Sequence, residues 1–162
     1  METKPIKRNK HIVKLSKDHH VTLLFCWKIR TGVKAEIDPE RIKKYIAYFW
    51  QHHMQPHFLQ EETILFAPVK DEAVQKALDE HAQIEKQIKD LSNDEAITVL
   101  QLSVLADSVD NHVRYEERIL FPHLEKVLNE QQLESIGNKI AAQENPELTD
   151  DFSDTFWLKD KK

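Results

Sequence analysis

The sequence is short of the residues that form tight turns and covalent cross-links. It has only two glycines and one cysteine in 162 residues, and aromatic residues make up 8% of the chain. A single cysteine excludes an internal disulfide bond and fits a reducing compartment. The scarcity of glycine, together with many Glu, Lys, Gln and Leu residues, favours helix over sheet.

Other missing features exclude several functional classes. Residues 1–10 lack the apolar core of a signal peptide, and no run of 18 apolar residues is present that would span a membrane. The net charge of −5 argues against nucleic-acid binding, which needs a concentrated basic surface. There is no glycine-rich phosphate loop and no nucleophile elbow. We therefore expect a cytoplasmic protein without a nucleic-acid or membrane partner.

Apolar residues that recur at intervals of three and four predict helices along most of the chain. Asp38-Pro39 is a strong helix start, Ser92 and Glu95 form a capping box, Gly32 is a natural helix end, and Pro56 should kink the helix that contains it. The expected spans are 11–31, 39–67, 70–91, a fourth from 92 past 120, and a short fifth over 130–143. Four long helices with short connections predict an all-α, antiparallel up-down-up-down four-helix bundle.

The bundle is expected to cover residues 11–145. A flexible basic segment, residues 1–10, precedes it, and a tail, residues 146–162, follows it. The tail carries Phe152, Phe156 and Trp157. These aromatic residues would pack on the bundle or on a protein partner, and a flexible tail is the alternative.

A repeated motif carries most of the functional information. Residues 56–68 read P-H-F-L-Q-E-E-T-I-L-F-A-P, and residues 112–122 read H-V-R-Y-E-E-R-I-L-F-P. In each copy a histidine, His57 or His112, precedes a glutamate, Glu61 or Glu116, by four residues. That spacing places both side chains on one face of a helix. An imidazole and a carboxylate on one face, twice in a chain, predict a metal site.

The other two long helices also carry histidine on their apolar stripes. The third has His81, and the first has His19 or His20. Carboxylates within apolar stripes are costly unless a cation compensates their charge. Imidazole with carboxylate, and no thiolate, suits iron, manganese or zinc, and two glutamates from facing helices can bridge two ions. The candidate ligands are His19, His20, His57, Glu61, His81, His112 and Glu116.

These motifs, with E-H-A-Q-I at 80–84, resemble the hemerythrin-like (HHE cation-binding) family over residues 12–128. The resemblance implies a four-helix bundle with a non-haem di-iron centre. It assigns His57, His81 and His112 as ligands and Glu61 and Glu116 as bridging carboxylates. The chain departs from the oxygen-carrying members in two ways. It has Ala77 where they have a second histidine four residues before that of the third helix, and Glu116 four residues after His112 where they have an aspartate at five.

On the first helix, the family pattern has apolar residues three and seven after the histidine. His20 fits this pattern with Leu23 and Trp27, while His19 fits an alternative stripe, and we favour His20. Additional ligands would come from His53, Glu62, Glu85 or Glu117, although we expect His53 in the core or behind a ligand and the three glutamates on the surface.

The expected function is a metal-binding module with two iron ions, zinc or manganese being possible replacements. It would bind dioxygen or nitric oxide, or sense iron or redox state, with Phe58, Ile64, Ile84 and Ile119 lining the gas pocket. One alternative is a di-iron enzyme that reduces peroxide or oxygen, or handles iron for storage or repair. Another is a structural bundle whose histidines are core residues.

Overall fold

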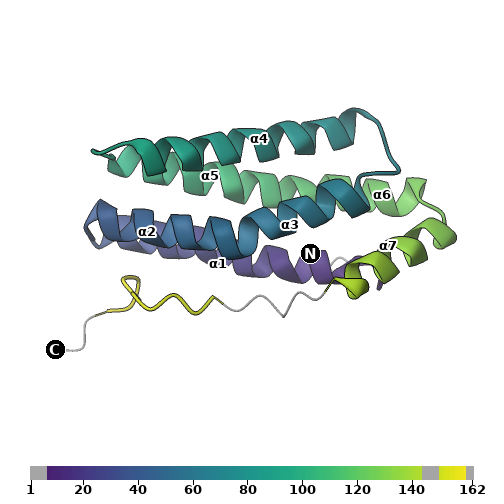
Figure 1. Ribbon diagram of the computed structural model, residues 1–162, viewed down its shortest axis with the longest axis horizontal. Helices are drawn as coiled ribbons and strands as arrows, with labels where there is room; N and C mark the ends of the chain where they lie inside the picture. The colour runs from purple at the N-terminus through teal and green to yellow at the C-terminus, as the bar shows by residue number, and fades with distance from the viewer. Residues whose placement is uncertain (1–6, 144–149, 160–162) are drawn as a thin grey trace, which may run out of the picture.

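All regular structure in the described part of the chain is helical. The computed structural model describes residues 7–143 and 150–159, and it contains no strand within these ranges (Figure 1). The α-helices are α1 (Val13–Lys34), α2 (Pro39–Phe49), α3 (Gln55–Gln60), α4 (Glu72–Asn93), α5 (Val99–Tyr115), α6 (Phe121–Val127) and α7 (Glu130–Ala142). Three π-helical turns, η1 (Trp50–Met54), η2 (Glu61–Leu65) and η3 (Glu116–Leu120), join some of them without a break.

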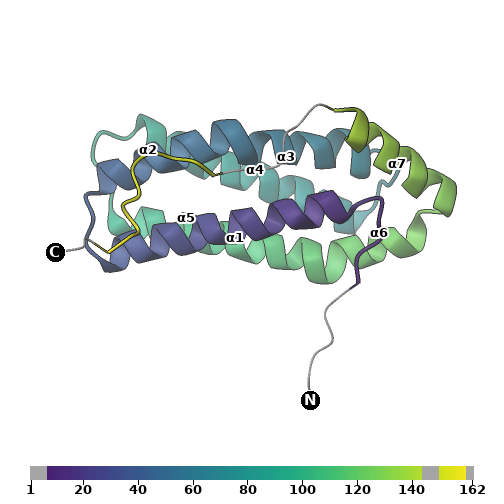
Figure 2. The same ribbon diagram turned by 90° about the horizontal axis from the view of Figure 1, so that it is seen from below.

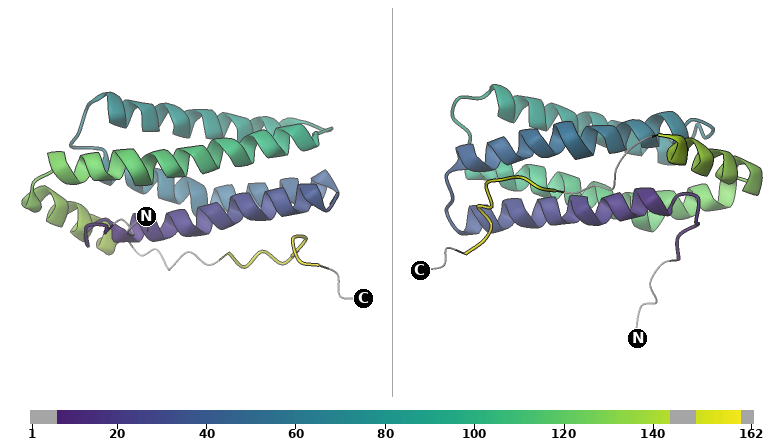
Figure 3. Two further views of the ribbon diagram at one scale, coloured as in Figure 1. Left: turned by 180° about the vertical axis from the view of Figure 1, so that it is seen from behind. Right: turned by 60° about the horizontal axis from the view of Figure 1, so that its bottom comes forward.

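The π turns create two long composite helices. One runs from α2 through η1 and α3 to η2, and the other runs from α5 through η3 to α6. They lie beside α1 and α4 along the long axis of the molecule, and α7 packs against η2 at one end (Figures 1 and 3). None of the described helices is long and apolar enough to cross a membrane.

Two apolar clusters fill the space between the long helices. One is centred on the aromatic residues Phe25, Tyr45 and Phe49, and the other contains Leu15, Leu65, Leu120 and Leu124. On each long helix, residues of one cluster precede a short polar stretch and residues of the other follow it. The polar stretches therefore lie at one level, enclosed by apolar side chains on both sides.

Two of the expected helix boundaries are wrong, one helix end and one helix start. Gly32 does not end the first helix, because α1 continues to Lys34 and the glycine is buried under Phe156. Ser92 does not start a helix either, because α4 continues to Asn93 with Leu91 packed in the core. The capping box before α5 is instead formed by Thr98 and Gln101. The expected start at Asp38-Pro39 is confirmed, since the Asp38 carboxylate accepts a hydrogen bond from the Glu40 backbone N–H at 3.0 Å.

Pro56 lies within a continuous helical segment, directly after a π turn. The Gln55 N–H bonds to the carbonyl oxygen of Trp50, five residues back, instead of the usual four. The same arrangement recurs before Pro122, where the Phe121 N–H bonds to the Glu116 carbonyl oxygen. Proline has no N–H to donate, so a widened turn absorbs its effect on the helix.

The described part of the tail, residues 150–159, lies along α1 and α2 (Figure 2). Phe156 is 3% exposed and packs on Tyr45, and Trp157 stacks over the Lys28 ammonium at 4.2 Å from the ring centroid. Asp150 accepts hydrogen bonds from Lys28 and Tyr45. The tail aromatics thus dock on the chain's own helices. The expected helix stop at Asn145-Pro146 lies outside the described residues.

Candidate metal centre

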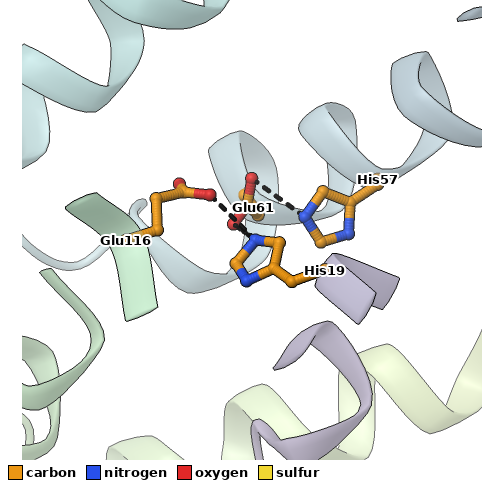
Figure 4. Close-up of side chains that lie close together, drawn as sticks. All are labelled: His19, His57, Glu61 and Glu116. Atoms are coloured by element: carbon orange, nitrogen blue, oxygen red, sulfur yellow. Dashed lines mark hydrogen bonds and ion pairs between the residues drawn. The ribbon is translucent and has the colours of Figure 1, made fainter. Parts of the chain in front are cut away.

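Six buried polar side chains meet between the two apolar clusters. No member of this group is more than 3% exposed. The group consists of His19 on α1, His57 on α3, Glu61 on η2, His81 on α4, His112 on α5 and Glu116 on η3. Figure 4 shows four of them, with the two histidines pointing toward the two carboxylates. Each of the four long helical segments therefore contributes at least one donor.

The Nε2 atoms of all four histidines face the two glutamates. His57 Nε2 and His81 Nε2 lie 3.3 Å and 3.2 Å from Glu61 Oε1. His19 Nε2 and His112 Nε2 lie 3.0 Å and 3.1 Å from Glu116 Oε1. The imidazoles thus present the same nitrogen to one small volume.

The donors form two overlapping sets of four, each with its ligand atoms within 4.8 Å of one another. One set is His19 and His57 with Glu61 and Glu116, and the other is His81 and His112 with the same two glutamates. The shared glutamates lie between two pairs of histidines. This arrangement can hold two cations that share both carboxylates.

Several donor atoms have no hydrogen-bond partner, although they are buried. They are Nε2 of His57, His81 and His112, both oxygens of Glu61, and Oε2 of Glu116. Their neighbours lie within ion-pair distance but not in hydrogen-bond geometry, as expected for atoms that point at a common centre instead of at each other. Buried polar atoms without partners are costly, and a bound cation would satisfy them. The residues present therefore fit a metal ion.

Both glutamates begin π turns. Glu61 is the first residue of η2 and Glu116 the first of η3, and the two turns have the related sequences E-E-T-I-L and E-E-R-I-L. The sequence repeat is therefore also a structural repeat. π turns within α-helices are frequent at functional sites, where they redirect side chains.

A second, outer set of carboxylates contacts the Nδ1 atoms of the four imidazoles, the ring nitrogens on the side away from the two glutamates. Nδ1 of His57 lies 3.0 Å from Asp18, Nδ1 of His81 lies 2.7 Å from Glu62, and Nδ1 of His112 lies 2.8 Å from Glu80. Nδ1 of His19 lies 3.2 Å from Glu117, within ion-pair distance although outside hydrogen-bond geometry. A carboxylate behind each imidazole fixes its orientation and makes it a stronger metal donor.

Each outer carboxylate contacts a histidine on a different helix. Asp18 of α1 contacts His57 of α3, and Glu62 of η2 contacts His81 of α4. Glu80 of α4 contacts His112 of α5, and Glu117 of η3 contacts His19 of α1. The four contacts therefore form a closed ring around the bundle, which we call the carboxylate ring.

The centre keeps its carboxylates ionised. Burial alone would raise the pKa of Glu61 and Glu116, but the histidines around them lower both pKa values below the usual range. Burial opposes charge on His19 and His81, yet the surrounding glutamates raise the pKa of both imidazoles well above its ordinary value. The geometry thus favours the anionic form of the glutamates, which is the form that binds a metal ion.

The preference for His20 is wrong for this structure, which brings His19 into the centre instead. On α1, the buried face includes Leu15, His19, Thr22, Cys26 and Ile29. His20 is exposed and lies on the face that carries Trp27, which is 52% exposed. The apolar residue seven positions after His20 therefore belongs to the surface and not to the core.

The four residues considered as additional ligands have three different surroundings in the structure. Glu62 and Glu117 are not simple surface residues, because they hold His81 and His19. Glu85 pairs with Lys89 away from the centre. His53 is buried, as expected, and neither of its ring nitrogens has a hydrogen-bond partner among the described residues.

Asp18 and Glu80 were missed by the sequence analysis. Each directly precedes a histidine of the centre, in D-H at 18–19 and E-H at 80–81. The acidic residue before each histidine was the sequence feature that could have pointed to these carboxylates. However, each carboxylate contacts a histidine on another helix and not the one that follows it in sequence.

Aromatic rings close the centre on both sides. Phe58 stacks on His81 with ring centroids 3.8 Å apart, and Phe121 stacks on His19 at 5.2 Å. Of the residues expected around a gas pocket, Phe58, Ile64 and Ile84 are buried, but Ile119 is 57% exposed and points away from the core. Phe58 and Phe121 thus place apolar rings directly against two of the donor imidazoles.

The comparisons with known proteins support a cation site. The model of the hemerythrin HHE cation binding domain matches residues 11–124, which include all six donors of the centre. No curated protein and no solved structure matches the chain.

Proposed function

The chain belongs to the hemerythrin HHE cation binding family, and from this we propose that its buried centre binds two iron ions. The observation that carries the proposal is the convergence of buried donor atoms from four helical segments, most of which have no hydrogen-bond partner. Nitrogen and oxygen donors without thiolate suit iron, with manganese or zinc as possible replacements. His19 and His57 would hold one ion, His81 and His112 the other, and Glu61 and Glu116 would be shared.

We propose that the scaffold is an antiparallel up-down-up-down four-helix bundle. This is supported by short connections at residues 35–38, 66–71 and 94–98, which lie at alternating ends of the long helices (Figure 1). We also propose a cytoplasmic location. A single buried cysteine supports it, because the chain needs no disulfide bond.

We further propose that the loaded centre binds dioxygen or nitric oxide, or reports iron or redox state. Bound iron supplies the affinity for a diatomic ligand. The chain supplies donors held by the carboxylate ring, the Phe58 ring stacked on His81, and further buried apolar residues such as Ile64 and Ile84 on the same helices. Exclusion of water strengthens the electrostatic interactions of the centre and protects a bound gas from side reactions.

Metal analysis after anaerobic iron loading tests the metal proposal. We expect about two iron ions per chain, and clearly less for His57→Ala and His112→Ala. His52→Ala, at an exposed position, is the matched control. Free metal at about 100 times its Kd should stabilise the fold by about 2.7 kcal/mol for each ion bound, seen as a higher Tm. Less than about half an equivalent of iron in the wild type would overturn the proposal.

Ala77 favours a second candidate, a di-iron enzyme that reduces peroxide or oxygen or handles iron for storage or repair. Ala77 is fully buried in an apolar cluster, so the place of a further helix donor is taken by a methyl group. A centre with fewer protein donors leaves coordination positions for a substrate. Peroxide consumption by the iron-loaded protein, lost in Glu61→Ala, would support the enzyme. A reversible change of the optical spectrum with oxygen, without turnover, would support the carrier or sensor.

A further inference from the structure

We propose that the two metal positions are unequal and that the position of His81 and His112 takes the first divalent cation. The proposal rests on the proposed function, because it concerns the order in which the same centre is filled. It follows from the charges behind the four histidines. The donors themselves do not distinguish the positions, since each has two imidazoles and the same two glutamates.

Behind His57, the outer carboxylate is already paired with a cation. Asp18 Oδ2 lies 3.0 Å from Lys14 Nζ and 3.0 Å from His57 Nδ1. Lys14 is held in place by a second hydrogen bond, to Gln60 at 2.9 Å. The positive charge of Lys14 therefore offsets the negative charge of Asp18.

Behind His19, the outer carboxylate also has a cationic neighbour. Glu117 Oε2 lies 3.6 Å from Arg8 Nη2 and accepts a hydrogen bond from Ser16 at 2.8 Å. The Arg8 side chain is 5% exposed and donates to the Glu117 carbonyl oxygen and to Glu125. Arg8 also balances Glu125, so it offsets the charge of Glu117 only in part.

Behind His81 and His112, the outer carboxylates have no such neighbour. Glu62 lies 2.7 Å from His81 Nδ1, and Glu80 lies 2.8 Å from His112 Nδ1. Within residues 7–143 and 150–159, no lysine or arginine forms an ion pair with either carboxylate. In this half of the carboxylate ring, neither carboxylate is therefore paired with a lysine or an arginine.

This difference in charge has two effects, and both favour metal binding at His81 and His112. Uncompensated negative charge attracts a divalent cation more strongly, because the interaction depends on the sum of nearby charges. A carboxylate without a competing cation also accepts the imidazole N–H more strongly, which makes the opposite nitrogen a better metal donor. We expect the first cation to bind about tenfold more tightly at His81 and His112 than at His19 and His57, the size of effect that outer carboxylates usually have.

The two stacked phenylalanines lie closest to different positions. Phe58 is 3.8 Å from His81 and 5.6 Å from His112 but 6.4 Å from His57, between ring centroids, and Phe121 is 5.2 Å from His19. The full chain would be labelled with 4-fluorophenylalanine, its fluorine signals assigned with Phe58→Leu and Phe121→Leu, and then titrated with Co²⁺ alone. Because a paramagnetic ion shifts nearby signals most, the Phe58 signal should move during the first equivalent and the Phe121 signal mainly during the second.

Charge variants test the cause. Glu80→Gln should weaken binding at the position of His81 and His112 by about tenfold, so that the Phe58 and Phe121 signals move together. Lys14→Met should strengthen binding at the position of His19 and His57 and narrow the difference between the two affinities. Glu85→Gln and Lys86→Met are the matched controls, because both residues form exposed pairs elsewhere on α4. Circular dichroism would show that each variant is folded.

Three outcomes would overturn the proposal, and they are distinguishable. If the Phe121 signal moves first, the order is reversed. If both signals move in parallel from the first addition, the positions are equivalent while the metal centre itself stands. If neither moves after two equivalents, the proposed function fails as well.

Discussion

The ring of Phe156 occupies the space that a side chain at Gly32 would need. A Cβ atom on Gly32 would lie 2.8 Å from Cε1 of Phe156 and 3.0 Å from Cδ1 of Ile42. Glycine within a helix costs about 0.5–1 kcal/mol relative to alanine. Here the loss is offset by a close contact that fixes the tail on the bundle.

Gly32→Ala should therefore destabilise the protein, although alanine is the better helix former. We expect a loss of about 1–2 kcal/mol, because the new methyl group must displace Phe156 or Ile42. Denaturant unfolding measures the change, and the emission of Trp157 reports displacement of the tail. In a Phe156→Ala background the same substitution should cost much less or become stabilising. An equal cost in both backgrounds would show that Phe156 is not the obstacle.

His19→Ala should weaken metal binding strongly, whereas His20→Ala should leave it unchanged. His19 Nε2 lies 3.0 Å from Glu116, while His20 is on the exposed face of α1. We expect a loss of at least about 10–100-fold for His19→Ala, measured by titration calorimetry with a divalent metal. A comparable loss in His20→Ala would contradict the orientation of α1.

The start of α5 can be tested with two small substitutions. The Thr98 hydroxyl accepts a hydrogen bond from the Gln101 N–H at 3.2 Å, so Thr98→Ala should cost about 1 kcal/mol of unfolding free energy. Ser92 is an exposed residue near the end of α4, and Ser92→Ala should change stability by less than about 0.5 kcal/mol. A larger loss of stability in Ser92→Ala than in Thr98→Ala would indicate that Ser92, and not Thr98, caps the helix.

Cys26 should be unreactive in the folded protein. Burial, reinforced by the nearby Asp110 carboxylate, raises the pKa of its thiol from 9.0 to about 12. Little thiolate is present at pH 7–9, and the side chain is 0% exposed. Alkylation should therefore follow unfolding and accelerate sharply in denaturant. Because the folded pKa is the higher one, the thiol's contribution to stability is present below pH 9 and is lost as pH rises toward 12. Rapid alkylation at pH 8 without denaturant would contradict the burial of Cys26.

Much of the centre could be predicted from local spacing. His57, His81 and His112 stand on helical stripes with apolar residues such as Ile64, Ile84 and Val109, so the spacing of the apolar residues places them inside. His19 could not be separated from His20 in this way, because Trp27 and Leu24 are apolar residues that lie on the surface, 52% and 43% exposed. The stripe that is actually buried includes the polar Thr22, which an apolar pattern does not favour.

The contacts between helices were beyond the reach of periodicity. Asp18 is adjacent to His19 in sequence, but it binds His57, because helix packing and not sequence distance decides its partner. The helix ends at Asn93 and Lys34 were missed for a related reason. Tertiary contacts of Leu91 and Gly32 extend both helices past residues that would otherwise be good stops.

The π turns at Glu61 and Glu116 each hold one residue more than an α-helical turn needs. The Phe66 N–H bonds to the Glu61 carbonyl oxygen and the Phe121 N–H to that of Glu116, five residues back instead of four. Loss of one residue between Glu61 and Leu65 would therefore turn η2 into an α-helical turn and leave the residues on either side in phase. These two points are where the long helices can change their length by one residue without moving the donors that precede the change.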